Sequence, residues 1–163
     1  MAILDIISME DPRLRAISKP IEEINNQVTN LVQDLVETME INSSVGLAAP
    51  QVGANICLFV INLDPKKNKH TVFINPSYES IDGSIQLSPE GCLSVGEIGA
   101  RLTRLNKIRV NYTDLDGNKM VMDTKGMLSA CIQHECDHLE GILFIDYLNK
   151  EKLIKIIGCI REK

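Results

Sequence analysis

The clearest chemical pattern in the sequence is a segment near its C-terminal end, Gln133-His134-Glu135-Cys136-Asp137-His138. On a helix, His134 and His138 lie one turn apart and point the same way, so two imidazoles can reach one cation. Glu135 lies beside them, close enough to reach a metal-bound water rather than the metal. Two histidines and a carboxylate that shuttles a proton are typical of a hydrolytic metal site. A solvated helix face is the plain alternative, but two of the chain's three histidines fall in this pattern.

A catalytic site of this kind needs a third protein ligand and one open position. Cys92, in the segment Glu90-Gly91-Cys92-Leu93-Ser94, is the preferred candidate because a thiolate suits a borderline-soft divalent ion. Cys136 lies roughly 200° around the helix from His134 and faces away from it. Cys131 is one turn before the histidines on their side of the helix, where it either lines a pocket or is a small core residue.

A third segment, Gly46-Leu47-Ala48-Ala49-Pro50-Gln51, combines small residues and a proline with a single polar amide. The Gln51 amide could donate a hydrogen bond to an oxyanion that develops during hydrolysis. Considered by itself, the segment is better explained by a loop glutamine whose hydrogen bonds are made locally.

Three segments that must position these residues have the helical period. The first follows the cap candidates Asn25-Asn26, and its apolar stripe consists of Val28, Leu31, Val32, Leu35, Val36 and Met39. The second runs from Met127 to Glu140, carries the two histidines and stops at Gly141. The third is a C-terminal amphipathic helix marked by Leu153, Ile154, Ile156, Ile157 and Ile160.

Apolar or alternating runs between these helices predict strands, among them residues 56–61 and 71–74. Asp82-Gly83 and Asp116-Gly117 predict hairpins, because an Asp-Gly pair accepts the positive φ of a type I′ turn. Strands in the middle and helices at either end predict an α+β fold. We expect a single domain over residues 1–163, with mixed or antiparallel sheets packed around the metal-binding helix, an N-terminal helix and a C-terminal helix.

Composition narrows the class of protein. The net charge of −5 argues against general nucleic-acid binding, which needs a surplus of Lys and Arg. With no Trp, three Phe and three Tyr, a base-stacking surface is not expected. No apolar run approaches the length of a membrane span. Five cysteines, an odd number, without a secretion signal predict a protein of the reducing cytoplasm.

Taken together, the three segments resemble the motifs of the peptide deformylases. Residues 46–51 resemble the first motif of that family, residues 90–94 the second, and residues 133–141 the third. The segment Asp11-Pro12-Arg13-Leu14-Arg15 also resembles the family's N-terminal region. Order, spacing and length agree over nearly the whole chain. The resemblance implies removal of the N-formyl group from the formyl-methionine that begins new polypeptides, with release of formate.

The resemblance also implies a role for each matching residue. Cys92, His134 and His138 would be the metal ligands. Glu135 would be the general base and then the acid, while Gln51 and the backbone N–H of Leu93 would hold the formyl oxygen. Residues at or near the substrate would be Val45, Gly46, Glu90, Arg104, Met127, Ala130 and Cys131.

The cofactor implied by the resemblance is one divalent metal ion, natively iron as Fe²⁺, for which Zn²⁺, Ni²⁺ or Co²⁺ can substitute. The partners implied are N-formylmethionyl nascent peptides. The ribosome near its exit tunnel is a further candidate, through the basic side chains of the terminal helix; a solvated basic face explains those side chains more simply. No nucleic-acid specificity and no membrane are expected.

Two positions depart from the family's motifs. Ser44 stands where the first motif usually begins with glycine, and Ser44 would be strained if that position requires a positive φ. Gly96 stands where proline is common and would make the loop after Cys92 more mobile. Neither departure removes a reacting group, so we expect altered substrate affinity rather than loss of the reaction.

Two other functions are open from the sequence. A metalloprotease that uses the same two-histidine helix would cleave internal peptide bonds, but it would leave the motifs around Gln51 and Cys92 unexplained. A catalytically weak, deformylase-like protein would keep the metal and bind peptides without turnover; Ser44 and Gly96 are its only support.

Overall fold

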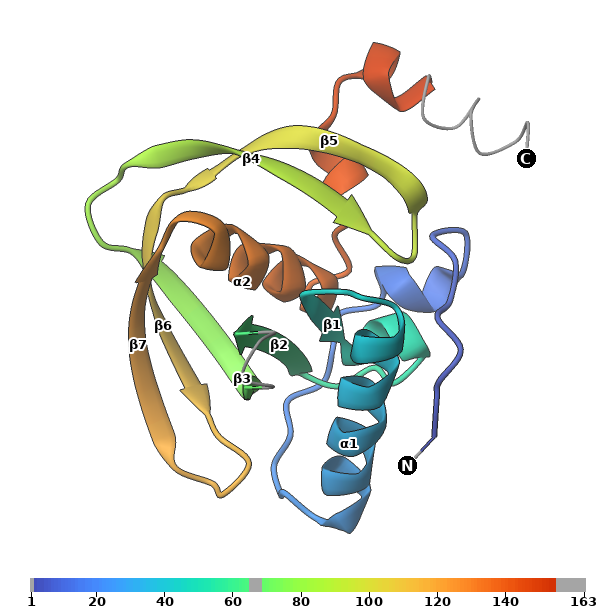
Figure 1. Cartoon of the computed structure of the whole chain (residues 1–163), viewed down its shortest axis with the longest axis vertical. Coiled ribbons are helices and arrows are strands. Elements are labelled where there is room, and N and C mark those ends of the chain that lie inside the picture. The colour runs from blue at the N-terminus through green and yellow to red at the C-terminus, as the bar shows by residue number, and fades with distance from the viewer. Residues whose placement is uncertain (1, 65–68, 155–163) are drawn as a thin grey trace.

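The computed structural model describes residues 2–64 and 69–154 and contains two antiparallel sheets (Figure 1). The larger sheet has five strands in the order β1-β2-β3-β6-β7, and the smaller pairs β4 with β5. The strand bounds are β1 Gly46–Ala48, β2 Leu58–Asp64, β3 Lys69–Ser80, β4 Ile85–Cys92, β5 Gly96–Leu105, β6 Lys107–Thr113 and β7 Lys119–Lys125. Every pairing within these sheets is antiparallel, which confirms the α+β class.

Two α-helices accompany the sheets, α1 over Asn26–Ile41 and α2 over Gly126–Leu139. Short 3₁₀ turns lie at η1 Pro12–Arg15, η2 Ala49–Val52 and η3 Phe144–Tyr147. Asn25 caps α1 as expected, since its side-chain oxygen accepts from the amides of Gln27 and Val28. The apolar stripe of α1 packs against β1 and β2 in one core cluster.

Helix α2 occupies the centre of the molecule, between the five-stranded sheet and the arch of β4 and β5 (Figure 1). Its Ile132 and Leu139 belong to a core cluster with Phe59 and Phe73 of the large sheet. The expected helix therefore exists, with both ends one residue earlier than the sequence suggested. It stops at Gly141, whose φ is +71° and where a Cβ would lie 2.5 Å from the Arg15 carbonyl oxygen. That close approach requires glycine.

One hairpin prediction is confirmed and one is wrong. Asp116-Gly117 joins β6 to β7, which pair with each other. Asp82-Gly83 also turns the chain, with Gly83 at φ +71°, but the strands on either side do not pair. Instead β3 pairs with β6 and β4 with β5, so the chain passes from one sheet to the other at this turn. The prediction of a turn was right, but the strands on either side of it pair with other partners.

The predicted C-terminal helix can be followed only in part. Residues 150–154 are helical, and the rest of that prediction lies outside the described residues. Within the ranges that the structure describes, no helix is both long enough and apolar enough to cross a membrane.

Candidate active site

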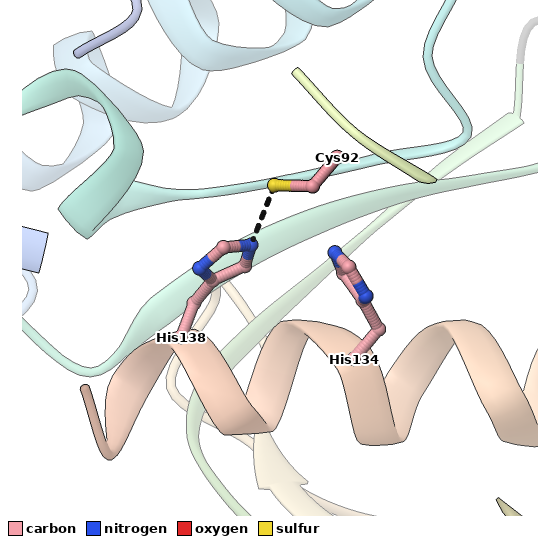
Figure 2. Close-up of side chains that lie close together, drawn as sticks. All are labelled: Cys92, His134 and His138. Atoms are coloured by element: carbon pink, nitrogen blue, oxygen red, sulfur yellow. Dashed lines mark hydrogen bonds between the residues drawn. The ribbon is translucent and has the colours of Figure 1, made fainter. Parts of the chain in front are cut away.

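Cys92 and the two histidines meet as the sequence predicted (Figure 2). Their ligand atoms all lie within 4.8 Å of one another, and Cys92 Sγ is 3.4 Å from His138 Nε2. Cys92 is the last residue of β4, while the histidines stand one turn apart on α2. Cys92 lies 42 positions before His134 and 46 before His138 in the sequence. The three side chains come together because the β4–β5 sheet covers α2.

The donor set fits a divalent ion. A thiolate with two imidazoles suits a borderline-soft cation. The Nδ1 atom of His134 lies 2.9 Å from Glu90 Oε2, the arrangement by which proteins orient a metal-binding imidazole. Among the described residues, the buried Nδ1 of His138 has no hydrogen-bond partner.

Electrostatics also favour a cation here. Burial lowers the pKa of His138 well below its usual range and keeps the imidazole neutral. Burial also opposes charge on His134, but hydrogen bonds to Cys92 and Glu90 outweigh it and raise the pKa of His134 to about 10. Cys92 and Glu90 therefore favour positive charge at His134, while His138 stays neutral.

Glu135 is buried beside the cluster, and one of its oxygens lacks a partner among the described residues. A Cβ on Gly46 would lie 2.6 Å from Glu135 Oε1, so only glycine leaves room for the carboxylate. Burial, aided by the charges of Glu90 and Asp137, raises the pKa of Glu135 to about 7 against the opposing effect of His134. A carboxyl group with such a pKa can both accept and return a proton near neutral pH.

Gln51 is buried in η2 and aimed at the cluster. Its oxygen accepts from the Ala48 amide at 3.0 Å, while its nitrogen lies 3.4 Å from Cys92 Sγ and 3.3 Å from Ser94 Oγ. The hydrogen bond to Ala48 is the local contact expected of a loop glutamine, and it also fixes the orientation of the side chain. The side-chain N–H groups therefore point toward the cluster.

A cavity of about 350 Å³ opens over these groups. It is lined by Asn42, Ser43, Ser44, Val45, Gly46, Gln51, Ser88, Pro89, Glu90, Gly91, Cys92, Leu93, Gly96, Met127, Ala130, Cys131, His134 and Glu135. Except for Arg104, every residue assigned to catalysis or substrate is among them. Sequence reasoning missed Asn42, Ser43, Ser88 and Pro89, which carry no catalytic motif of their own.

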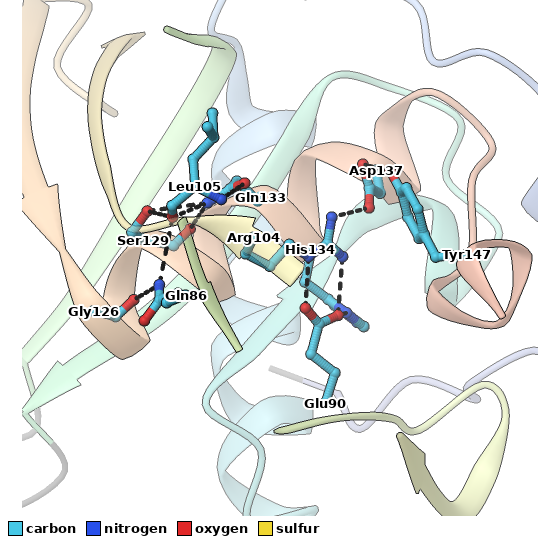
Figure 3. A network of polar contacts seen from close by, with 10 residues as sticks. All are labelled: Gln86, Glu90, Arg104, Leu105, Gly126, Ser129, Gln133, His134, Asp137 and Tyr147. Atoms are coloured by element: carbon cyan, nitrogen blue, oxygen red, sulfur yellow. Dashed lines mark hydrogen bonds and ion pairs between the residues drawn. The ribbon is translucent and has the colours of Figure 1, made fainter. Parts of the chain in front are cut away.

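Arg104 differs from its expected place on the peptide path. It does not line the cavity but lies buried between two carboxylates, donating to Glu90 Oε1 at 2.6 Å and to Asp137 Oδ2 at 2.8 Å (Figure 3). The Tyr147 ring lies 4.8 Å from its guanidinium carbon, and the Tyr147 hydroxyl donates to Asp137. Arg104 thus fixes the position of Glu90 by donating to it, and Glu90 in turn is hydrogen-bonded to His134. No spacing rule links these residues, so the sequence could not reveal the network.

The two departures from the motifs have specific structural outcomes. The positive φ at this turn falls on Ser43, at 52°, and not on Ser44, so the expected strain at Ser44 is wrong. The Ser43 and Ser44 amides donate to Glu40 and Met39 carbonyls and end α1. Gly96 has a φ of +99°, which proline cannot adopt.

Comparison with known proteins agrees with this geometry. The family described as Polypeptide deformylase matches residues 3–153. The chain is 44% identical to a peptide deformylase of Azotobacter vinelandii over 96% of its length and 93% of the relative's. It is 43% identical to one of Pseudomonas aeruginosa, with the same shares of each chain covered.

Solved structures extend the likeness to three dimensions. The peptide deformylase of Ehrlichia chaffeensis in complex with actinonin superposes with a TM-score of 0.93 at 34% identity, covering 99% of this chain and 98% of the other. The peptide deformylase of Legionella pneumophila gives 0.94 at 35% identity, with 99% and 95% covered. A family match over most of the sequence, relatives above 40% identity and the same fold lead to one conclusion: the chain belongs to the polypeptide deformylase family.

Proposed function

We propose that the cavity over Cys92, His134 and His138 is the site at which this chain removes the N-formyl group from the formyl-methionine of new polypeptides. Formyl removal is the activity of the family to which the chain belongs. The observation that carries the residue assignment is the meeting of three ligand atoms near an oriented amide and a buried carboxylate, one oxygen of which has no partner among the described residues.

Cys92, His134 and His138 would hold one divalent ion, with Fe²⁺ the native metal we propose and Zn²⁺, Ni²⁺ or Co²⁺ as substitutes. Such an ion supplies Lewis acidity and lowers the pKa of bound water toward about 7. The side chains of α2 set up this chemistry because Glu90 orients His134 and burial keeps His138 neutral. In this way the central helix becomes the metal-binding element.

Two groups would bind the formyl oxygen as negative charge develops. The Nε2 group of Gln51 donates from one side of the cluster, and the backbone N–H of Leu93 donates from the residue that follows Cys92. Glu135 takes a proton from the water that attacks the formyl carbon. It delivers that proton to the amine nitrogen as the C–N bond breaks and formate leaves, for which a pKa of about 7 is suited.

The rest of the cavity would receive the methionine. Met127, Ala130 and Cys131 follow one another along α2 and line its wall with apolar and sulfur-containing side chains. Val45 and Gly46 also line the cavity and would hold the peptide backbone in an extended pose. Glu90 contributes through His134 and Arg104 through Glu90, rather than by contact with the peptide.

Formate release from formyl-Met-Ala-Ser by the Fe²⁺- or Ni²⁺-loaded protein is the direct test. We expect release well above that of the Glu135→Ala variant. Release no greater than the variant's, with tight formyl-peptide binding, would instead support a binding protein. A casein digest with the same sample distinguishes a metalloprotease, which would cut internal bonds.

Three coarser expectations belong to the same proposal. Residues 1–163 would form one catalytic domain, because both sheets pack on α2. The cytoplasm is the proposed location, since Cys57, Cys92, Cys131 and Cys136 are free thiols. Contact with the ribosome stays a prediction, because most of the basic terminal segment lies outside the described residues.

A further inference from the structure

The two groups proposed to bind the formyl oxygen come from separate parts of the chain. Gln51 lies in η2, whereas Leu93 lies in the turn that follows β4. In that turn the Val95 amide donates to the Cys92 carbonyl at 3.0 Å. The Gln51 side-chain nitrogen lies 3.3 Å from Ser94 Oγ, 43 residues away in the sequence. Oxyanion donors stabilise a transition state only when they are held in one geometry, so any contact that joins η2 to this turn bears on the reaction.

A second connection is made by residues 7–9, here called the N-terminal strap. The Ile7 amide donates to the Gln51 backbone carbonyl at 2.9 Å. Two residues later, the Met9 amide donates to the Ser94 carbonyl at 2.8 Å. The same short piece of chain is thereby bonded to η2 and to the turn after β4. Together with the contact between Gln51 and Ser94, these bonds close a ring of hydrogen bonds beside the proposed oxyanion site.

Packing and the pattern of bonded amides support this contact. Met9 is half-buried and packs against the core cluster that contains Cys92 and Val95. Ser8, between the two bonded residues, is exposed, and its amide donates to no group within residues 2–64 and 69–154. Because bonded and free amides alternate, the N-terminal strap meets the site with one edge of its backbone.

We propose that Ile7 and Met9 are positioning residues for the reaction. Their backbone N–H groups hold η2 and the turn after β4 at the separation at which Gln51 and Leu93 can bind one formyl oxygen. This inference rests on the proposed function. Neither Ile7 nor Met9 lines the cavity, so the N-terminal strap acts through the residues that it bonds and not by contact with substrate. A displaced donor weakens binding of the transition state more than binding of the substrate, so loss of the strap should lower kcat and leave KM nearly unchanged.

Exchange of one backbone amide for an ester tests this role without changing a side chain. The α-hydroxy acid counterpart of isoleucine at position 7 removes only the N–H that bonds to the Gln51 carbonyl. For formate release from formyl-Met-Ala-Ser, we expect this ester protein to lower kcat about three- to tenfold, part of the roughly 100-fold contribution of one oxyanion donor. KM and the metal content should stay at the wild-type values. An ester at position 9, which removes the bond to Ser94, should have the same effect.

The α-hydroxy acid counterpart of serine at position 8 is the matched control. It introduces the same ester into the same segment but removes an amide N–H that is not bonded within the described ranges, so kcat and KM should both stay unchanged. Urea unfolding of the apo proteins measures how much stability each ester costs.

A double-mutant cycle distinguishes positioning of Gln51 from general support of the fold. In Gln51→Ala, the ester at position 7 has no side-chain donor left to displace. Its further effect on kcat should therefore be less than about twofold, because two changes that act through one group are not additive. An N-terminal strap that only supported the fold would lower kcat equally in both backgrounds.

The inference is overturned if the ester at position 7 leaves kcat unchanged, raises KM instead, or lowers kcat equally in the Gln51→Ala background. Absence of formate release from the wild type would contradict the proposed function itself, so the two failures are distinguishable.

Discussion

Two buried polar regions share helix α2 and differ in how well their groups are paired. On the cavity side, the Oε2 atom of Glu135 and the Nδ1 atom of His138 have no partner among the described residues. On the side of β5, the guanidinium of Arg104 binds both Glu90 and Asp137, and Gln133 bonds to both backbone groups of Leu105 (Figure 3).

The difference in pairing indicates that the cavity side carries out the reaction, whereas the network on the β5 side supports the structure. Unpaired buried groups cost free energy and persist where they do chemistry, whereas a fully paired network holds its members in one geometry. Glu90 joins the two regions, since it accepts from Arg104 and holds His134. Substitutions on the cavity side should therefore reduce rate, and those in the network should reduce stability.

Removal of Cys92, the proposed sulfur ligand, should have the largest effect. Cys92→Ala leaves two imidazoles, which hold a divalent ion weakly, so we expect loss of most bound metal and of formate release. Elemental analysis of anaerobically purified protein measures the first effect. Cys131→Ala is the matched control, because Cys131 lines the cavity outside the ligand cluster and its variant should keep one ion. A Cys92→Ala protein that retains one ion per chain would contradict the assignment.

Glu135→Gln should lower kcat on the order of 10²- to 10⁴-fold, because an amide cannot carry the proton. Its stability should not fall, since the substitution puts a neutral group of the same shape in place of a buried carboxylate, one oxygen of which has no partner among the described residues. Formate kinetics and urea unfolding of the same sample measure both. Glu140→Gln, at the exposed end of α2, should leave both unchanged. A Glu135→Gln rate within tenfold of wild type would remove Glu135 from proton transfer.

Arg104→Met should have the opposite effect to Glu135→Gln and reduce stability more than it reduces rate. Loss of the cation leaves Glu90 and Asp137 buried without compensation, a change expected to cost about 3–5 kcal/mol of unfolding free energy. Urea unfolding of the apo proteins measures it. Arg109→Met breaks an exposed ion pair with Asp123 and should shift the midpoint little. If both variants unfold alike, the network does not support the fold.

Gln51→Ala should give the smallest effect, a decrease in kcat of about 100-fold with metal content retained, because one donor to the developing oxyanion is lost. Gln86→Ala is the matched control. It removes another part-buried side-chain amide, which donates to the Gly126 carbonyl, and it should not change kcat. A decrease of less than fivefold for Gln51→Ala would mean that Leu93 alone suffices.

Much of the scaffold could be predicted because its signals are local. The cap at Asn25 and the apolar stripe of α1 are confirmed, and α2 differs by one residue at each end. The partner of β3 could not be predicted. Asp82-Gly83 turns the chain in either case, and the pairing of β3 with β6 joins segments that are distant in the sequence, which local turn chemistry does not specify.

The ligand cluster was predictable for a related reason. Helical geometry places His134 and His138 together, and thiolate chemistry singles out Cys92. The family resemblance suggested that Arg104 lies near the peptide path, but such a resemblance does not say whether the side chain faces the peptide or a buried carboxylate; here it bonds to Glu90 and Asp137. Its inward orientation follows from the register of β5 on β4, where it lies opposite Gln86.

The sequence by itself determined which chemistry is available: a thiol, two imidazoles one helical turn apart, an adjacent carboxylate, and the helices and turns that carry them. These depend on residue type and short-range geometry. Only the tertiary structure decided that β4 brings Cys92 to α2, that Arg104 donates to Glu90, and that Ser44 donates to the Gly46 carbonyl. Such contacts join residues whose separation along the chain carries no information, because burial and strand pairing act on the folded surface as a whole.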